Sequence, residues 1–233
     1  SYSNHKGEAE SFLGEYREAH SPDSCHIATS FFELVDPRFT YVFQKQLKKL
    51  HTDRIDFYSL EGVCDLNKMR DIDSGAVDFL FEQREAGHIG CLGFSSELSP
   101  DNLRDFIGRY PWDFVRMKVN YCDWFNKNGS ARYEVAKEFN LPIIAHAALR
   151  TGAASALKPE AVSILKDANP NRSSIDWALR FVKSLDAIAS VTCNMHSTRE
   201  VKENAAIFND AETLSPEEFT VLEACAKAQQ KAH

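Results

Sequence analysis

The sequence predicts an α/β protein built on a parallel sheet, and among such proteins a (β/α)8 TIM barrel. Segments with a strand pattern and segments with a helix pattern alternate along nearly the whole chain of 233 residues. The strand segments are apolar on both faces, as parallel strands covered by helices are. The competing architecture, an open doubly wound sheet, usually has a GxGxxG turn after its first strand, and this sequence has none. A barrel needs eight strands and the pattern gives six, so we expect the first two strands to be absent from this sequence.

Six short apolar runs, bounded by polar or turn-forming residues, are predicted to be strands. They are residues 26–32, 54–62, 88–96, 113–121, 142–149 and 187–194. The second run, RIDFYSLEG, carries Glu61 near its carboxyl end. A carboxylate does not belong inside a packed apolar sheet. Its place at the tip of a strand therefore indicates a site of chemistry, or the remnant of one.

The intervening segments are predicted to be helices, because apolar residues recur at helical spacing and helix-end residues flank them. They are residues 8–19, 39–50, 76–87, 99–110, 129–140, 159–168, 173–185 and 197–208. Pro37 opens the second helix, Gly87 closes the third, and Ser99 with Pro100 starts the fourth.

We expect a single domain over residues 1–233, incomplete at its N-terminus, with residues 215–230 as an added C-terminal helix. Ser215 and Glu218 have the spacing of a capping box at the start of that helix. Trp124 is expected in a loop that follows a strand, where it could line a pocket.

Composition limits the classes of partner. A net charge of -7 argues against nucleic acid and against an anionic membrane surface. The longest apolar stretches are strand-length, far from the ~20 residues of a membrane span, and the polar N-terminus has no signal-peptide core. The six cysteines are scattered, without a CxxC pair. This pattern predicts a reducing, cytoplasmic compartment and no metal or iron–sulfur site.

Four motifs, in this order along the chain, together resemble the aldo-keto reductase superfamily. They are QLKKLHTDRIDFYSLEG, REAGHIGCLGFSS, LPIIAHAALRTG and NMHSTREVKEN. The wording is closest to the subgroup that often carries a C-terminal ferredoxin-like extension, which this sequence lacks. The resemblance implies a (β/α)8 barrel that transfers a hydride between NADP(H) and a carbonyl or alcohol. It also implies a catalytic Asp, Tyr, Lys and His at the carboxyl-terminal rim of the barrel.

The resemblance places altered residues at these catalytic positions. The Asp would precede Ser1, Tyr2 corresponds to the Tyr, Ser30 to the Lys and Glu61 to the His. In the family the Lys ammonium lowers the pKa of the Tyr, which then gives its proton to the carbonyl oxygen. A serine carries no charge to do this, and an ionised Glu61 would repel a developing alkoxide. Carbonyl reduction is therefore expected to be slow.

The residues that the resemblance assigns to the cofactor differ from the family pattern as well. Glu200 stands where many members place an Arg on the 2′-phosphate, and its carboxylate would repel that group. The assigned positions are Ser95 and Ser96 at the carboxamide, Arg116 for the family Gln, His146 for the stacking Tyr, Leu149, Arg150, Thr151 and Gly152 at the phosphates, and Asn194, Met195, His196, Ser197, Glu203 and Asn204 at the adenosine end.

Two functions follow, and both stay open. One is an NADP(H)-dependent oxidoreductase with a small carbonyl substrate, in which Tyr2 gives the proton and Glu61 assists. The other is a catalytically inactive barrel that binds or regulates a protein partner. Arg116 bears on both, because a cation inside a barrel strand needs a partner. Glu61 is one candidate for that partner, and a phosphate or carboxylate ligand is another.

Overall fold

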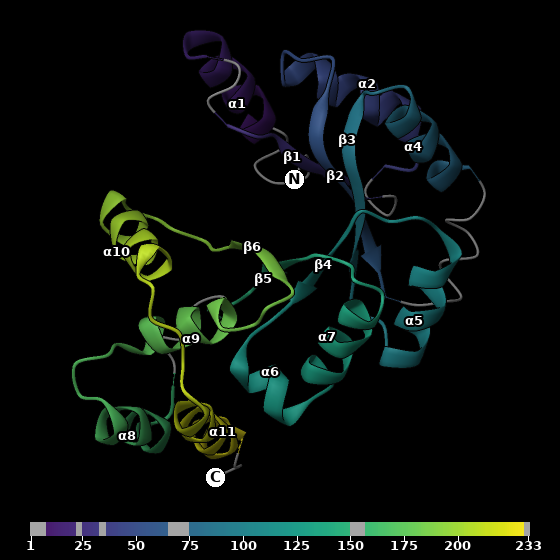
Figure 1. Cartoon of the computed structure of the whole chain (residues 1–233). Coiled ribbons are helices and arrows are strands. Elements are labelled where there is room, and N and C mark those ends of the chain that lie inside the picture. Colours follow the sequence, from purple (N-terminus) through teal and green to yellow (C-terminus); the bar gives the residue numbers. More distant parts are fainter. Residues whose placement is uncertain (1–7, 22–24, 33–35, 65–74, 150–156, 231–233) are drawn as a thin grey trace. The chain divides into compact units, whose positions relative to one another are not determined.

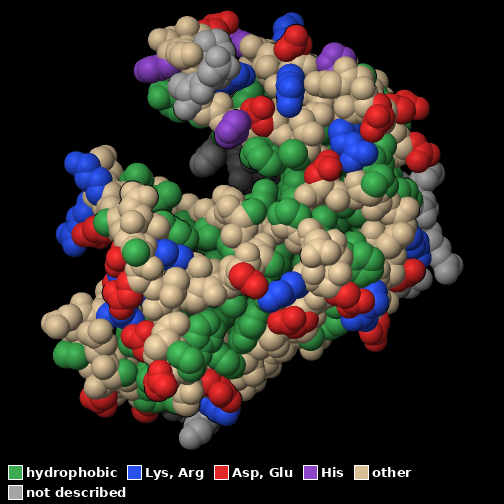
Figure 2. All heavy atoms as spheres, viewed as in Figure 1, with side chains coloured by type: hydrophobic (Ala, Val, Ile, Leu, Met, Phe, Trp, Pro, Cys, Tyr) green, Lys and Arg blue, Asp and Glu red, His purple; other side chains and the backbone are tan. Residues whose placement is uncertain are grey.

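The computed structural model describes residues 8–21, 25–32, 36–64, 75–149 and 157–230. The chain divides into two compact units, Ser1–Arg116 and Met117–His233. Tyr2, Arg150, Thr151 and Gly152 lie outside the described residues. On the face shown in Figure 2, acidic and basic side chains are interspersed. Within the described ranges, no helix has the length and apolar character needed to cross a membrane.

Six strands follow one another in the sheet in the same order as in the chain (Figure 1). They are β1 Ala28–Phe31, β2 Ile55–Val63, β3 Ile89–Ser96, β4 Phe114–Lys118, β5 Ile143–His146 and β6 Ile188–Thr192. Strand pairs β1–β2, β2–β3, β3–β4 and β5–β6 are parallel. Parallel strands in chain order, separated by helices, are the arrangement of a (β/α) barrel, so the predicted fold class is confirmed.

The helices also occupy the predicted segments. The first unit has α1 Glu8–Ala19, α2 Phe39–Lys49, α4 Ala76–Glu85 and α5 Pro100–Arg109. The second unit has α6 Tyr121–Asn126, α7 Gly129–Glu138, α8 Pro159–Ala168, α9 Ser174–Lys183, α10 Thr198–Asn209 and α11 Pro216–Gln230.

Helix α6 was not predicted, and the expectation that Trp124 lies in a loop is wrong. The side chain of Asn120 accepts a hydrogen bond from the backbone N–H of Asp123 and so caps this short helix. With six residues, α6 is too short to show a hydrophobic period. The ring of Trp124 packs on Tyr133 and Phe181, with centroids 5.1 and 5.4 Å away. Trp124 is therefore part of the packing of the second unit.

The two faces of β2 show how the first unit is built. Tyr58 faces α2, where its ring meets Phe43 edge-on and its hydroxyl donates to Gln46 at 2.6 Å. Side chains alternate along a strand, so Phe57 and Glu61 project from the opposite face. There Phe57 meets the ring of Phe114 from β4, with centroids 5.9 Å apart. The face of the sheet opposite α2 thus carries both an aromatic contact and Glu61.

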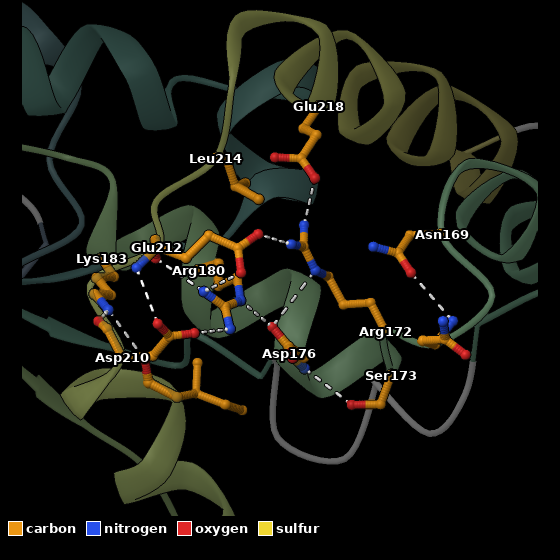
Figure 3. Close-up of polar contacts among 12 residues, drawn as sticks. Asn169, Arg172, Ser173, Asp176, Arg180, Lys183, Asp210, Glu212, Leu214 and Glu218 are labelled. Atoms are coloured by element: carbon orange, nitrogen blue, oxygen red, sulfur yellow. Dashed lines mark hydrogen bonds and ion pairs between the residues drawn. The ribbon is translucent and has the colours of Figure 1, made fainter.

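In the second unit, α11 packs against α8 and α6. Its predicted capping box is confirmed. The backbone N–H of Ser215 donates to Glu218 at 3.0 Å, and that of Glu218 donates to the Ser215 hydroxyl at 3.3 Å. A cluster of ion pairs centred on Arg172 and Arg180 links α9 to the start of α11 (Figure 3).

Candidate functional site

A polar layer lies toward the carboxyl ends of β2, β3 and β4 and consists of Glu61, Ser95 and Arg116. Ser95 and Arg116 are register neighbours on β3 and β4. Nη1 of Arg116 donates to Oε1 of Glu61, and the hydroxyl of Ser59 donates to the same oxygen at 3.1 Å. The side chains of Arg116 and Glu61 are 28% and 21% exposed. The pair is therefore shielded from bulk water but still within reach of a small molecule.

The small residues of β3 allow this pair to form. Strand β3 lies between β2 and β4 in the sheet, so the Arg116 side chain must pass across it to reach Glu61. On this face β3 presents Gly93 and Ser95, which leave the path open. The prediction that Arg116 needs a partner, with Glu61 as a candidate, is thereby confirmed.

Ser30 stands one strand away from the layer. It is 2% exposed and is the register neighbour of Ser59 on β2. Its carbonyl oxygen accepts a hydrogen bond from Gln46 at 2.9 Å, but its buried hydroxyl has no partner among the described residues. A buried hydroxyl without a partner typically costs ~1–3 kcal/mol. No described Lys or Arg bonds to this hydroxyl, so the position of the family Lys carries no cation there.

The two predicted carboxamide residues lie on different faces of β3. Ser95 is half-buried and belongs to the polar layer. Ser96 is buried, and its hydroxyl accepts a hydrogen bond from the backbone N–H of Leu98 at 3.1 Å, which ties it to the turn after the strand. The binding of a carboxamide by either serine stays a prediction.

In the second unit, His146 ends β5. Its carbonyl oxygen accepts a hydrogen bond from the backbone N–H of Val119 at 3.1 Å, and Thr192 is its register neighbour on β6. The next residue, Ala147, has φ = 55°, so the chain turns sharply after the strand. Leu149 follows in that turn and is half-buried. The stacking role of His146 and the phosphate role of Leu149 stay predictions.

The amino-terminal end of α10 gives Glu200 a structural role. The Ser197 hydroxyl accepts from the backbone N–H of Glu200 at 3.2 Å, while Oε2 of Glu200 accepts from the backbone N–H of His196 at 2.8 Å. This reciprocal arrangement is a capping box. The spacing of Ser197 and Glu200 was visible in the sequence and could have identified it. Glu203 pairs with the exposed Arg199 at 2.8 Å, and Asn204 is the one buried residue of α10.

A cavity of about 390 Å³ lies at the amino-terminal ends of β5 and β6, lined by residues that include Lys137, Asn140 and Asp186. The Lys137 ammonium and the Tyr133 hydroxyl both bind the Asp186 carboxylate. Burial, followed by this hydrogen bond, raises the pKa of Tyr133 to about 12. The charges are already paired, so the cavity offers little to a charged ligand. Among the described residues, no cluster of three or more His, Cys, Asp or Glu could hold a metal ion.

Comparison with known proteins identifies the family. The model of the aldo/keto reductase family matches residues 1–227. No curated protein matches the sequence. The holo form of aldo-keto reductase AKR11C1 from Bacillus halodurans is similar, with a TM-score of 0.78 at 20% identity, over 97% of this chain and 81% of that chain. The glycerol dehydrogenase AKR11B4 from Gluconobacter oxydans is also similar, with a TM-score of 0.74 at 16% identity, over 95% and 78%.

Proposed function

Because the chain belongs to the aldo/keto reductase family, we propose that it binds NADP(H) and reduces the carbonyl group of a small molecule, slowly. The observation that carries this proposal is the polar layer of Glu61, Ser95 and Arg116 toward the carboxyl ends of neighbouring parallel strands. Barrel enzymes keep their active sites at that end of the strands. Six free cysteines support a reducing, cytoplasmic compartment for the protein.

The dinucleotide would supply the hydride, and the chain must supply a proton and hold the substrate. In the proposal, Tyr2 gives the proton to the carbonyl oxygen. Ser30 offers no ammonium to assist it, which forgoes a pKa shift of about 1–3 units in the acid. General acid–base assistance is typically worth about 10²–10⁴-fold in rate. Since Glu61 is engaged with Arg116, it is a poor substitute for the missing assistance.

The residues proposed to hold the dinucleotide fit it in part. Ser30 leaves a buried hydroxyl without a described partner in the first unit. In the second unit, Ser197 and Asn204 lie on the first turns of α10 as the resemblance requires. Glu200 fits NADP(H) less well, because its carboxylate closes the capping box where a 2′-phosphate would need a cation. The remaining proposed contacts are Ser95, Ser96, Arg116, His146, Leu149, Arg150, Gly152, Asn194 and Glu203.

A second candidate function is a binding or regulatory subunit without redox chemistry. A specific pair of observations favours it. Ser30 carries no charge at the position of the family Lys, and Glu61, at the position of the family His, is held by Arg116. Both changes remove assistance from the same proton transfer.

Titration with NADPH, followed through nicotinamide fluorescence, tests the proposal. We expect saturable binding and slow, measurable reduction of a simple aldehyde. An absence of binding at millimolar NADPH would remove the proposal. Binding without turnover would favour the regulatory subunit, and fast turnover would exclude that second candidate.

A further inference from the structure

We propose that Arg116 is the receptor for the carboxylate group of a small organic acid, and that Glu61 holds the guanidinium while no ligand is bound. The inference deepens the proposed function, because a bound acid that also carries a carbonyl group would be the substrate. It rests on that function only for the word substrate. Binding of the acid itself needs neither NADPH nor turnover.

The first argument is the number of hydrogen-bond donors on Arg116. A guanidinium has five N–H donors in a planar fork. Within the described part of the chain, Arg116 uses one of them, from Nη1 to Oε1 of Glu61. Its side chain is 28% exposed, so a small molecule can approach the remaining donors. A second carboxylate can bind to the guanidinium beside Glu61 or in its place.

The second argument is the surrounding polar layer. The Ser30 hydroxyl is buried without a partner in the described ranges, and its register neighbour Ser59 donates to Glu61. In-register neighbours on parallel strands project from the same face. Ser30 thus lies on the ligand side of the sheet as a donor that is still to be satisfied. A ligand oxygen is the kind of acceptor that would satisfy it.

The third argument is charge and shape. Arg116 and Glu61 carry opposite charges that largely cancel, so a doubly charged phosphate would meet the Glu61 carboxylate at close range. A carboxylate is planar, singly charged and matched to the guanidinium fork. It gains the charge-assisted bonds with less repulsion. The structure therefore favours a carboxylate over a phosphate.

Calorimetric titration of the full chain without nucleotide tests the proposal, with butyrate and 2-oxobutyrate as probes and neutral butyramide as their comparison. We expect both acids to bind and butyramide to give no signal. Arg116→Gln should weaken binding of the acids about tenfold or more, the size of a lost charge-assisted bond. Glu61→Gln should strengthen it severalfold, because it removes the competing carboxylate. Arg109→Gln, which removes a charge from an exposed pair on α5, should leave the affinity unchanged.

Arg116→Lys supplies a further check because it keeps the charge and loses the fork, so its affinity should fall between those of the natural chain and Arg116→Gln. Circular dichroism identifies any variant that fails to fold, and Glu61→Gln and Arg116→Lys then decide. Equal binding of butyramide, weaker binding by Glu61→Gln, or preference for inorganic phosphate would each overturn the proposal. NADPH titration of the same samples tests the proposed function separately, so the two failures can be told apart.

Discussion

The ring of Phe114 lies directly over Gly93. A Cβ atom added to this glycine would stand 2.6 Å from Cδ2 of the ring and 2.4 Å from the carbonyl oxygen of Phe114. The glycine thus allows Phe114 to reach across β3 to Phe57. Arg116 follows two residues later on the same face of β4 and crosses β3 in the same direction. The aromatic contact and the ion pair therefore depend on the same narrow part of β3.

Gly93→Ala should lower the free energy of unfolding by about 1–3 kcal/mol, the usual cost of overpacking. It should also weaken carboxylate binding, because displacement of β4 moves Arg116. Urea unfolding and calorimetry measure the two effects. Gly87→Ala is the matched control. It meets nothing within 4 Å but has φ = 84°, so it should cost about 1–2 kcal/mol and leave ligand binding intact. Unchanged binding in Gly93→Ala would contradict the shared path across β3.

The ion-pair cluster of the second unit gives a second prediction. Arg180 is 6% exposed, and its guanidinium binds Asp176 and Asp210 at 2.5 Å each and the carbonyl oxygen of Glu212 at 2.9 Å (Figure 3). Arg180→Met leaves these acceptors without their cation, so we expect a loss of roughly 3–5 kcal/mol in unfolding free energy. Urea unfolding measures it.

The control for Arg180 is Lys227→Met, which breaks the exposed pair with Glu223 on α11. Exposed pairs are worth about 0–1 kcal/mol, so its midpoint should hardly move. Equal losses in the two variants would show that the cluster around Arg180 contributes no more than a surface ion pair.

Tyr133 predicts a loss of stability at high pH. Burial and the hydrogen bond to Asp186 raise its folded-state pKa to about 12, against about 10 in an unfolded chain. The neutral phenol therefore stabilises the fold fully below about pH 10, and this contribution is lost as the pH rises toward 12. In Tyr133→Phe the free energy of unfolding should decline less across that window. Lys137→Met serves as the control, because the Asp186 carboxylate raises the pKa of Lys137 in the same cluster. A natural chain with the same alkaline slope as Tyr133→Phe would contradict the prediction.

The sequence predicted most of the fold because each strand and long helix has its own hydrophobic period. It also predicted the Glu61–Arg116 contact, since an unpaired cation in a strand is costly and both residues lie at strand tips. Helix α6 escaped, because a cap at Asn120 rather than a period defines it. The cap made by Glu200 escaped as well, because the resemblance directed attention to the cofactor and away from the local Ser-x-x-Glu pattern.

Contacts between strands were harder to predict than the strands themselves. The orphaned hydroxyl of Ser30 depends on its register with Ser59. The path of Arg116 across β3 depends on the short side chain at Ser95. Register is a property of the paired strands, and one strand's sequence does not contain it. The predicted layer was therefore correct in its members and incomplete in its bonding.

Glu200 gives the last prediction, which concerns selectivity between NADPH and NADH. The carboxylate accepts a hydrogen bond from the backbone N–H of His196, and by the proposed function it faces the 2′-phosphate. Glu200→Gln keeps an acceptor for that N–H and removes the charge. We expect NADPH affinity to rise roughly two- to fivefold, the size of an exposed charge interaction, while NADH affinity stays constant. Fluorescence titration with both nucleotides measures the ratio, and Glu217→Gln on α11 controls for net charge. An unchanged ratio would mean that Glu200 serves the helix cap alone.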